Sequence, residues 1–80
     1  MTRHQTSRSK RLTQDPRAIT RRRIAAGLSI TALAHRAGIS IGFLCHIEKG
    51  EKSASAETLG KLSAALDCEI TDLMAEELVG

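Results

Sequence analysis

The 80-residue sequence predicts an all-α fold of five helices that follows a flexible basic arm. Two observations support this prediction. Apolar residues recur at the three- and four-residue spacing of amphipathic helices, and no segment shows the alternation expected of a strand. Residues that cap helix N-termini, and glycines that end helices, stand at the boundaries of these segments. A chain of this length forms one domain, which we assign to residues 15–80.

The first helix is expected over residues 16–26. Asp15 is a suitable N-cap, Pro16 has the fixed φ that suits a first helical position, and Gly27 ends the segment. Residues 1–14 are polar, basic and without periodicity, which is typical of a disordered arm.

Residues 28–50 predict two short helices joined by a tight turn. The helices span 30–37 and 41–49, and each is preceded by a serine that can serve as N-cap and followed by a glycine. Gly38 ends the first of them, because glycine adopts the left-handed conformation without a Cβ penalty. Two helices of this length with a turn of about three residues form a helix-turn-helix, whose second helix enters the major groove of DNA.

Two further helices complete the prediction. Ser55 caps a helix over residues 56–66, whose inner stripe holds three leucines, and a short fifth helix is expected over residues 70–78. The connections are short, so the apolar faces of the five helices can close one small core.

The formal charge of +3 is unevenly distributed. Residues 1–23 hold eight lysines and arginines against one aspartate, a charge of +7, whereas residues 24–80 carry −4. A basic arm on an acidic body fits a polyanion that is contacted through one face, although a solvated tail has the same composition. Phe43 is the single aromatic residue. Because proteins that bind single strands stack bases on aromatic side chains, duplex DNA is favoured over RNA or single-stranded DNA.

The remaining composition favours a cytoplasmic protein that is not an enzyme and needs no cofactor. The N-terminus lacks the apolar stretch of a secretory signal, and no run of about eighteen apolar residues predicts a membrane span. Cys45 and Cys68 form neither a disulfide framework nor a CxxC pair, and the spacing of Cys and His predicts no metal site. No nucleophile–base constellation or phosphate loop predicts catalysis, and no small-molecule ligand is evident.

Residues 19–74 resemble the Xre/Cro family of lambda-repressor-like helix-turn-helix domains. The resemblance covers about seventy per cent of the chain and implies a five-helix lambda-repressor-like bundle that binds double-stranded DNA. It rests on a series of matches: Arg23, Gly27-Leu28-Ser29, Leu33-Ala34, Ala37-Gly38-Ile39-Ser40, Phe43-Leu44, Ile47-Glu48-Lys49-Gly50, Glu57-Thr58-Leu59, Leu62 and Ala65-Leu66.

The resemblance implies a role for individual positions. The residues that would face the bases are Ser40, Ile41, Gly42, Cys45 and His46. The residues that would lie near the DNA backbone are Ser29, Phe43, Lys49, Lys52 and Ser53. Arg23 and Glu48 match a salt bridge that joins the first and third helices in the family, and such a bridge would set the angle of the recognition helix. Arg23 on a phosphate is the alternative.

The chain departs from the family pattern at several of these positions. Ile30 stands where the family usually has a glutamine that contacts a phosphate or a neighbouring side chain. Ile41 and Gly42 stand where polar residues often read base edges, so Ile41 would contact a thymine methyl, unless a different helix tilt leaves both residues without a role. His46 is the strongest hydrogen-bonding candidate, toward guanine or a phosphate, with a solvated bystander as the alternative. Cys45 is a small residue that fits the groove or, less favoured, a redox sensor.

Because the helix over 41–49 offers few base readers, the basic arm gains importance. We expect its cations to follow the DNA backbone or to enter an A·T-rich minor groove. The residues concerned are Arg3, Arg8, Lys10 and Arg11.

These features together predict a sequence-specific transcription regulator that is associated with the nucleoid of a bacterial cell or of a phage-infected host. They favour a repressor that acts by occupying its operator. The alternative is a DNA-binding antitoxin or another protein-interaction module. A homodimer is expected through an apolar C-terminal surface. The less favoured alternative is that Leu73 and Leu78 close the core of a monomer. The residues of that surface are Ile70, Leu73, Met74 and Leu78.

Overall fold

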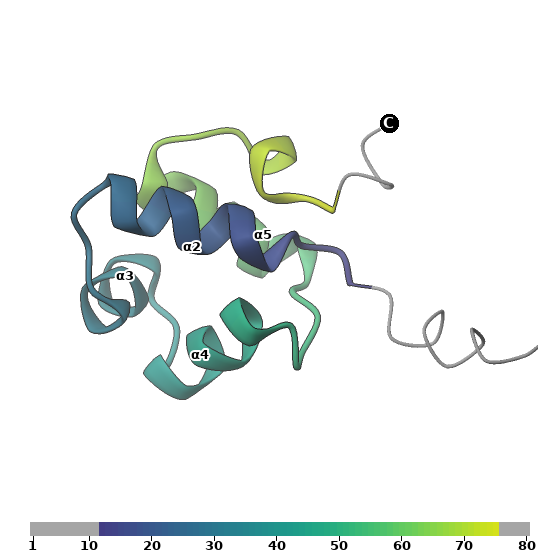
Figure 1. Ribbon diagram of the computed structural model, residues 1–80, viewed down its shortest axis with the longest axis horizontal. Helices are drawn as coiled ribbons and strands as arrows, with labels where there is room; N and C mark the ends of the chain where they lie inside the picture. Colours follow the sequence, from purple (N-terminus) through teal and green to yellow (C-terminus); the bar gives the residue numbers. More distant parts are fainter. Residues whose placement is uncertain (1–11, 76–80) are drawn as a thin grey trace, which may run out of the picture.

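A computed structural model describes residues 12–75, which contain four α-helices and one short 3₁₀ helix and no β-strand. The elements are α2 (Pro16–Ala25), α3 (Ile30–Ala37), α4 (Ile41–Lys49), α5 (Ala56–Leu66) and η1 (Ile70–Leu73). Helix α2 packs against α4 and η1, while α5 packs against α3 and η1, so the elements enclose a common interior (Figure 1). The all-α prediction is confirmed for this part of the chain.

The interior is built from the apolar stripes of the helices. Six large aliphatic side chains have no exposed surface, and they come from every helical element: Ile19, Leu33, Leu44, Ile47, Leu62 and Leu73. Burial of each of these side chains contributes about 1.5–3 kcal/mol to folding before the entropy cost is counted. This small core fixes the relative positions of α3 and α4.

Capping residues set the observed helix boundaries. Asp15 accepts hydrogen bonds from the backbone N–H groups of Arg17 and Ala18, and a serine caps each of the next three helices. Helices α3, α4 and α5 have the predicted bounds. Helix α2 ends one residue earlier than predicted, and Ala26 is its exposed C-cap.

The predicted fifth helix over residues 70–78 is wrong in type and extent. The chain forms a 3₁₀ helix that ends at Leu73, and Met74 is extended, with φ −83° and ψ 153°. Met74 forms an antiparallel bridge with Gln14, so tertiary pairing replaces the next helical turn. Leu78 lies outside the described residues.

The assignment of residues 12–14 to a disordered arm is also corrected. Gln14 is 1% exposed, and its side-chain amide donates to the carbonyls of Ile47 and Lys52 at 3.2 and 2.8 Å. Its Oε1 accepts from the N–H of Ala54 at 3.0 Å. Thr13 donates its N–H to the hydroxyl of Ser53 at 3.2 Å. These residues therefore belong to the folded domain, and they attach its first segment to the loop that follows α4.

No single helix among residues 12–75 is long and apolar enough to cross a membrane; only α3 and α4 taken together, which are bent by 111° relative to one another, reach that length and composition.

We predict that Gln14→Ala lowers the free energy of unfolding by about 2 kcal/mol, because the buried N–H of Ala54 and the carbonyl of Lys52 lose their side-chain partner. Urea denaturation followed by circular dichroism measures this change. Thr71→Ala, at an exposed position of η1, is the control and is expected to change stability by less than about 0.5 kcal/mol. Equal stability of the two variants would show that the Gln14 network is dispensable.

Candidate nucleic-acid interface

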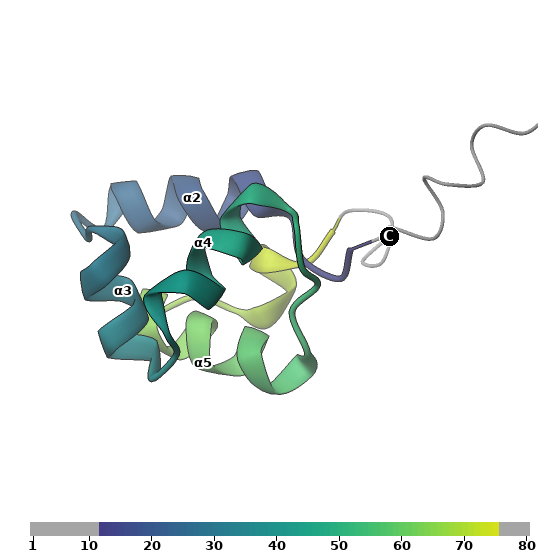
Figure 2. The same ribbon diagram turned by 90° about the horizontal axis from the view of Figure 1, so that it is seen from below.

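Helices α3 and α4 form the predicted helix-turn-helix. They are joined by residues 38–40 and meet at a bend of 111°, within the range of this motif. Gly38 adopts the left-handed conformation with φ 73°, and the N–H of Ile39 closes the end of α3 by bonding to the carbonyl of Ala34 at 3.0 Å. Figure 2 shows α4 in front of the other helices, with its outer side uncovered by any described element.

The outer side of α4 carries the residues that the family resemblance assigns to base contacts. Leu44 and Ile47 are buried, so the residues opposite them on the helix point outward. Ile41 is 48% exposed, Gly42 is exposed with nothing near its absent Cβ, and Cys45 and His46 are half-buried. Ser40 is exposed, but its hydroxyl oxygen caps α4 by accepting from the N–H of Phe43 at 3.0 Å. Its remaining O–H is available as a donor.

The residues expected near a DNA backbone occupy two locations. Ser29 caps α3 by accepting from the N–H of Ala32 at 3.0 Å, and Phe43 is half-buried against the core. Lys49 and Lys52 are exposed at the end of α4 and in the following loop. Ser53 is exposed, yet its hydroxyl is already bonded to Thr13.

A buried ion pair fixes α4 against α2. The Nε of Arg23 donates to Oε2 of Glu48 at 2.8 Å, and Nη2 donates to Oε1 at 3.2 Å, so the contact is bidentate. The two side chains are only 14% and 7% exposed. The hydroxyl of Thr20 donates to Oε1 of Glu48 at 2.8 Å, and Nη1 of Arg23 donates to the carbonyl of Leu28 at 3.0 Å. Three of the five guanidinium N–H groups therefore have protein partners, which favours the ion pair over a phosphate contact.

Two contacts near this surface, Thr20 with Glu48 and His46 with Glu51, could not be predicted from the sequence. Thr20 is one hydroxyl on a helix, and such a residue gives no indication of a partner on another element. The second contact joins Nδ1 of His46 to Oε1 of Glu51 at 2.6 Å. One of the two ring nitrogens of His46 is therefore already engaged within the protein.

Ile30 compensates for its departure from the family pattern by packing. It is half-buried against the core rather than presented to solvent, so an apolar residue fits this position on α3. Cys68 is likewise half-buried against the core, and burial raises the pKa of its thiol, which disfavours the reactive thiolate.

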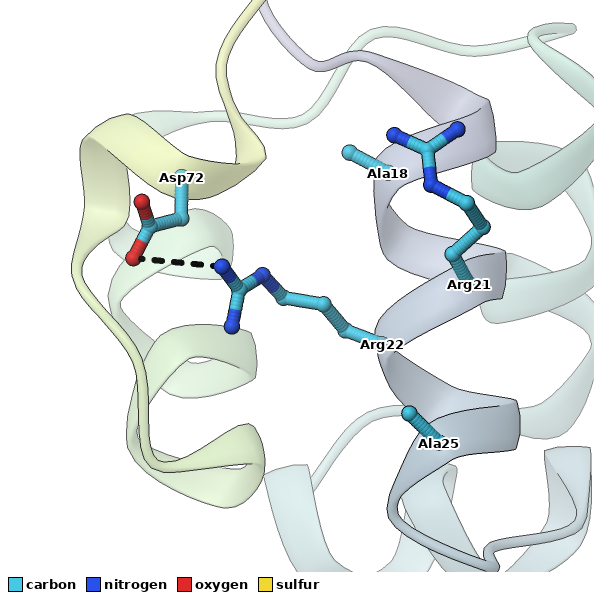
Figure 3. Close-up of a pocket in the computed structure, with 5 residues that line it drawn as sticks. All are labelled: Ala18, Arg21, Arg22, Ala25 and Asp72. Carbon is cyan, nitrogen blue, oxygen red and sulfur yellow. Dashed lines mark ion pairs between the residues drawn. The ribbon is translucent and has the colours of Figure 1, made fainter.

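The opposite side of the domain has a shallow groove of about 320 Å³ between α2 and η1 (Figure 3). Arg22 and Asp72 face one another across it, with 3.7 Å between Nη2 and Oδ2. The lining residues are Ala18, Arg21, Arg22, Ala25 and Asp72. Among residues 12–75, no three His, Cys, Asp or Glu side chains are grouped so that they could hold a metal ion.

The arm and the expected dimer surface are covered only in part. Arg3, Arg8, Lys10 and Arg11 lie outside the described residues. Leu12, the first described residue, lies beside Gly50 at the end of α4. In the expected dimer surface, Leu73 has no exposed surface and belongs to the core, which corrects its assignment to an interface. Ile70 remains 40% exposed and Met74 is half-buried.

The fold and the exposed second helix define a helix-turn-helix protein. The profile of the HTH_3 helix-turn-helix family matches residues 19–73. The chain therefore belongs to the HTH_3 family, which is the Xre/Cro family that the sequence resembles, and it is a DNA-binding transcription regulator by class.

Solved structures of regulators have the same fold. The restriction-modification controller protein C.AhdI from Aeromonas hydrophila is 30% identical with a TM-score of 0.70, and the match covers 71% of this chain and 86% of that one. The biofilm master regulator SinR, solved in complex with DNA, is 30% identical with a TM-score of 0.70 over 72% of this chain and 97% of that one. An HTH_3 family transcriptional regulator from Vibrio cholerae is 32% identical with a TM-score of 0.70; the match covers 75% of this chain but only 34% of that regulator. No curated protein sequence matches the chain significantly.

We predict that Glu48→Ala lowers the free energy of unfolding by about 3 kcal/mol, because the Arg23 guanidinium is left buried without its counter-charge. Thermal and urea denaturation measure this loss. The matched control is Glu57→Ala, which removes the exposed partner of Lys61 in an i,i+4 pair and is expected to cost less than about 1 kcal/mol. A Glu48 variant as stable as the Glu57 variant would contradict the role of the buried pair.

Proposed function

We propose that the protein binds specific sites in double-stranded DNA by inserting α4 into the major groove. The observation that carries the proposal is the exposed outer side of α4, held out by a 111° bend from α3 and fixed to α2 by a buried ion pair. A helix presented in this way matches the width of the major groove. SinR, a relative of the same fold, was solved in complex with DNA.

The outer side of α4 supports readout by shape and apolar contact more than by hydrogen bonds. Ile41 is suited to the methyl group of thymine, and Gly42 permits close approach of the helix backbone to the base edges. Cys45 adds a small side chain that fits against the groove wall. Among these outward-facing residues of α4, His46 alone has a ring nitrogen that can form a hydrogen bond with a base.

Backbone contacts would come from both ends of the motif. The first turn of α3, next to Ser29, presents backbone N–H groups to which a phosphate can bind. Lys49 and Lys52 supply exposed cations at the other end of the motif. Phe43 is half-buried, and its exposed part would pack against the sugar–phosphate chain. The hydroxyl of Ser53 is bonded to Thr13, so Ser53 would orient the loop in addition to any contact with a phosphate.

The basic arm would extend the contact along the same duplex. Leu12 lies beside Gly50, so the arm enters the domain next to the C-terminal end of the recognition helix. From that position Arg3, Arg8, Lys10 and Arg11 could follow the backbone or enter an adjacent minor groove. We place this activity at the nucleoid in the cytoplasm.

The proposed outcome of binding is repression by occupancy, in which the bound protein excludes RNA polymerase from an overlapping promoter.

We further propose that two copies bind one operator, with Ile70 and Met74 contributing apolar surface and Leu78 a further apolar side chain. Ile24 on α2 and Ile70 in η1 are 63% and 40% exposed. Such exposed apolar side chains also favour the second candidate function, an antitoxin or other module with a protein partner.

The deciding experiment is selection of bound duplexes from a random pool with the full chain. Enrichment of one sequence family, arranged as two half-sites about one helical turn apart, supports a dimeric specific regulator. Light scattering with and without the selected duplex then reports the number of copies bound. Transcription from a promoter that overlaps the site tests repression. A pool without enrichment would contradict sequence-specific binding.

We predict that deleting residues 1–11 weakens DNA binding without unfolding the domain, because the packed residues 12–14 are retained. The slope of log affinity against log salt concentration is negative. For every phosphate that the arm neutralises, the deletion is expected to reduce the magnitude of this slope by about 0.9. Fluorescence anisotropy across a salt series measures that slope, and circular dichroism controls for folding. An unchanged slope would show that the arm neutralises no phosphates.

We predict that Lys49→Ala reduces affinity for all duplexes to a similar extent, since it removes a cation that binds phosphate rather than a base. The substitution is also expected to reduce the magnitude of the slope of log affinity against log salt concentration by about 0.9. Anisotropy on the selected site and on a scrambled duplex measures both effects. Lys61→Ala, on α5, removes an exposed cation from another helix and serves as the matched control. Equal slopes for the two variants would exclude Lys49 from the backbone contacts.

A further inference from the structure

The recognition helix ends in a motif that places an acidic side chain on His46. Gly50 adopts the left-handed conformation with φ 76°, and the N–H of Glu51 donates to the carbonyl of His46 at 2.8 Å. This bond, which spans six residues, is that of a Schellman motif and folds the chain back over the last turn of α4. The carboxylate of Glu51 consequently lies 2.6 Å from Nδ1 of His46.

The chemistry of this contact assigns the imidazole proton. An ionised carboxylate can only accept a hydrogen bond, so Nδ1 must be the donor and must carry hydrogen. A neutral imidazole that is protonated at Nδ1 has its lone pair at Nε2. Nε2 is on the edge of the ring away from the carboxylate, and His46 is 46% exposed on its side chain. In its neutral form the ring therefore offers its environment an acceptor rather than a donor.

We propose that Glu51 is a positioning residue for base readout and holds His46 in the Nδ1–H tautomer, so that Nε2 accepts a hydrogen bond from the exocyclic amine of adenine or cytosine. The proposal rests on the proposed insertion of α4 into the major groove. In that groove, adenine N6 and cytosine N4 are the base-edge donors, whereas guanine presents acceptors. The assignment replaces the guanine contact that His46 alone would suggest.

The exposure of the pair separates this role from a structural one. Glu51 is 53% exposed, and exposed ion pairs contribute little to stability. A carboxylate close to a DNA surface also opposes the phosphates, so its benefit is selectivity rather than affinity. Variants of Glu51 are therefore expected to fold, which keeps the test informative.

The first arm of the test is nitrogen-15 NMR of the full chain without DNA, in alkaline buffer in which histidine side chains are neutral. The expected spectrum of His46 shows a protonated Nδ1 and an unprotonated Nε2. Glu51→Ala is expected to lose this preference, whereas Glu51→Gln is expected to keep it, because the amide oxygen can still accept from Nδ1–H. A His46 that is protonated at Nε2 in the unmodified protein would overturn the proposal.

The second arm compares base preference in the same alkaline buffer, by selection from random duplexes. The unmodified protein is expected to prefer adenine or cytosine at one position of the site, by roughly three- to tenfold, the effect of one hydrogen bond. His46→Ala and Glu51→Ala are expected to lose that preference while still selecting the rest of the site, and Glu51→Gln is expected to retain it. Glu57→Ala removes an exposed carboxylate from α5 and should leave the preference unchanged.

The outcomes are distinguishable. If the unmodified protein selects a site and Glu51→Ala keeps the same base preference, the positioning role is wrong while the proposed function stands. If Glu51→Gln loses the preference as fully as Glu51→Ala, an acceptor at this position does not suffice to hold the Nδ1–H tautomer, and the proposal is also overturned. If no duplex is selected at all, the proposed function fails, and the readout by His46 fails with it.

Discussion

The carboxylate of Glu48 is the point on which the geometry of the DNA-binding motif depends. It accepts hydrogen bonds from Arg23 and Thr20, both on α2, and it stands on the recognition helix itself. A buried ion pair is costly to desolvate, so it is not a large source of stability relative to apolar packing. The ion pair instead fixes the orientation of α4 relative to α2, because its bidentate geometry tolerates little rotation between the two helices. The apolar core brings α2 and α4 together, and this polar contact selects one arrangement among those that packing would allow.

The same guanidinium also controls the start of the helix-turn-helix. Arg23 donates to the carbonyl of Leu28, immediately before the N-cap of α3. One side chain therefore links the end of α2, the entry to α3 and the last turn of α4. Loss of this side chain would loosen both helices of the motif together. The recognition surface is thus positioned by an ion pair within the protein.

Local sequence signals predicted the four α-helices well, because their boundaries depend on caps. Serines before α3, α4 and α5, and Asp15 before α2, supply hydrogen bonds that need no distant partner. The predictions are wrong where a residue distant in the sequence determines the local conformation. Gln14 reads as one polar residue in a basic segment, yet three backbone groups that lie 33 to 40 residues away enclose its amide. Met74 continues an apparently helical pattern, but its bridge to Gln14 holds it extended.

The candidate interface shows the same division. The position of the recognition helix and its apolar, glycine-containing outer side follow from the sequence pattern, and so does the Arg23–Glu48 pair once the resemblance is recognised. The tie between His46 and Glu51 depends on the fold of the helix end, where a left-handed glycine turns the chain back. Helical periodicity does not encode such a reversal, so the partner of His46 could be identified only from the three-dimensional structure.

The two ends of the described fold meet. Ala75 donates its N–H to the carbonyl of Thr13 at 2.8 Å, and Asp15 donates to the carbonyl of Leu73 at the same distance. A segment whose entry and exit lie side by side is well suited to insertion within a surface loop of a host protein, because neither connection has to cross the domain. The same adjacency would allow residues 12 and 75 to be joined by a short peptide, and the domain could then be opened elsewhere as a circular permutant.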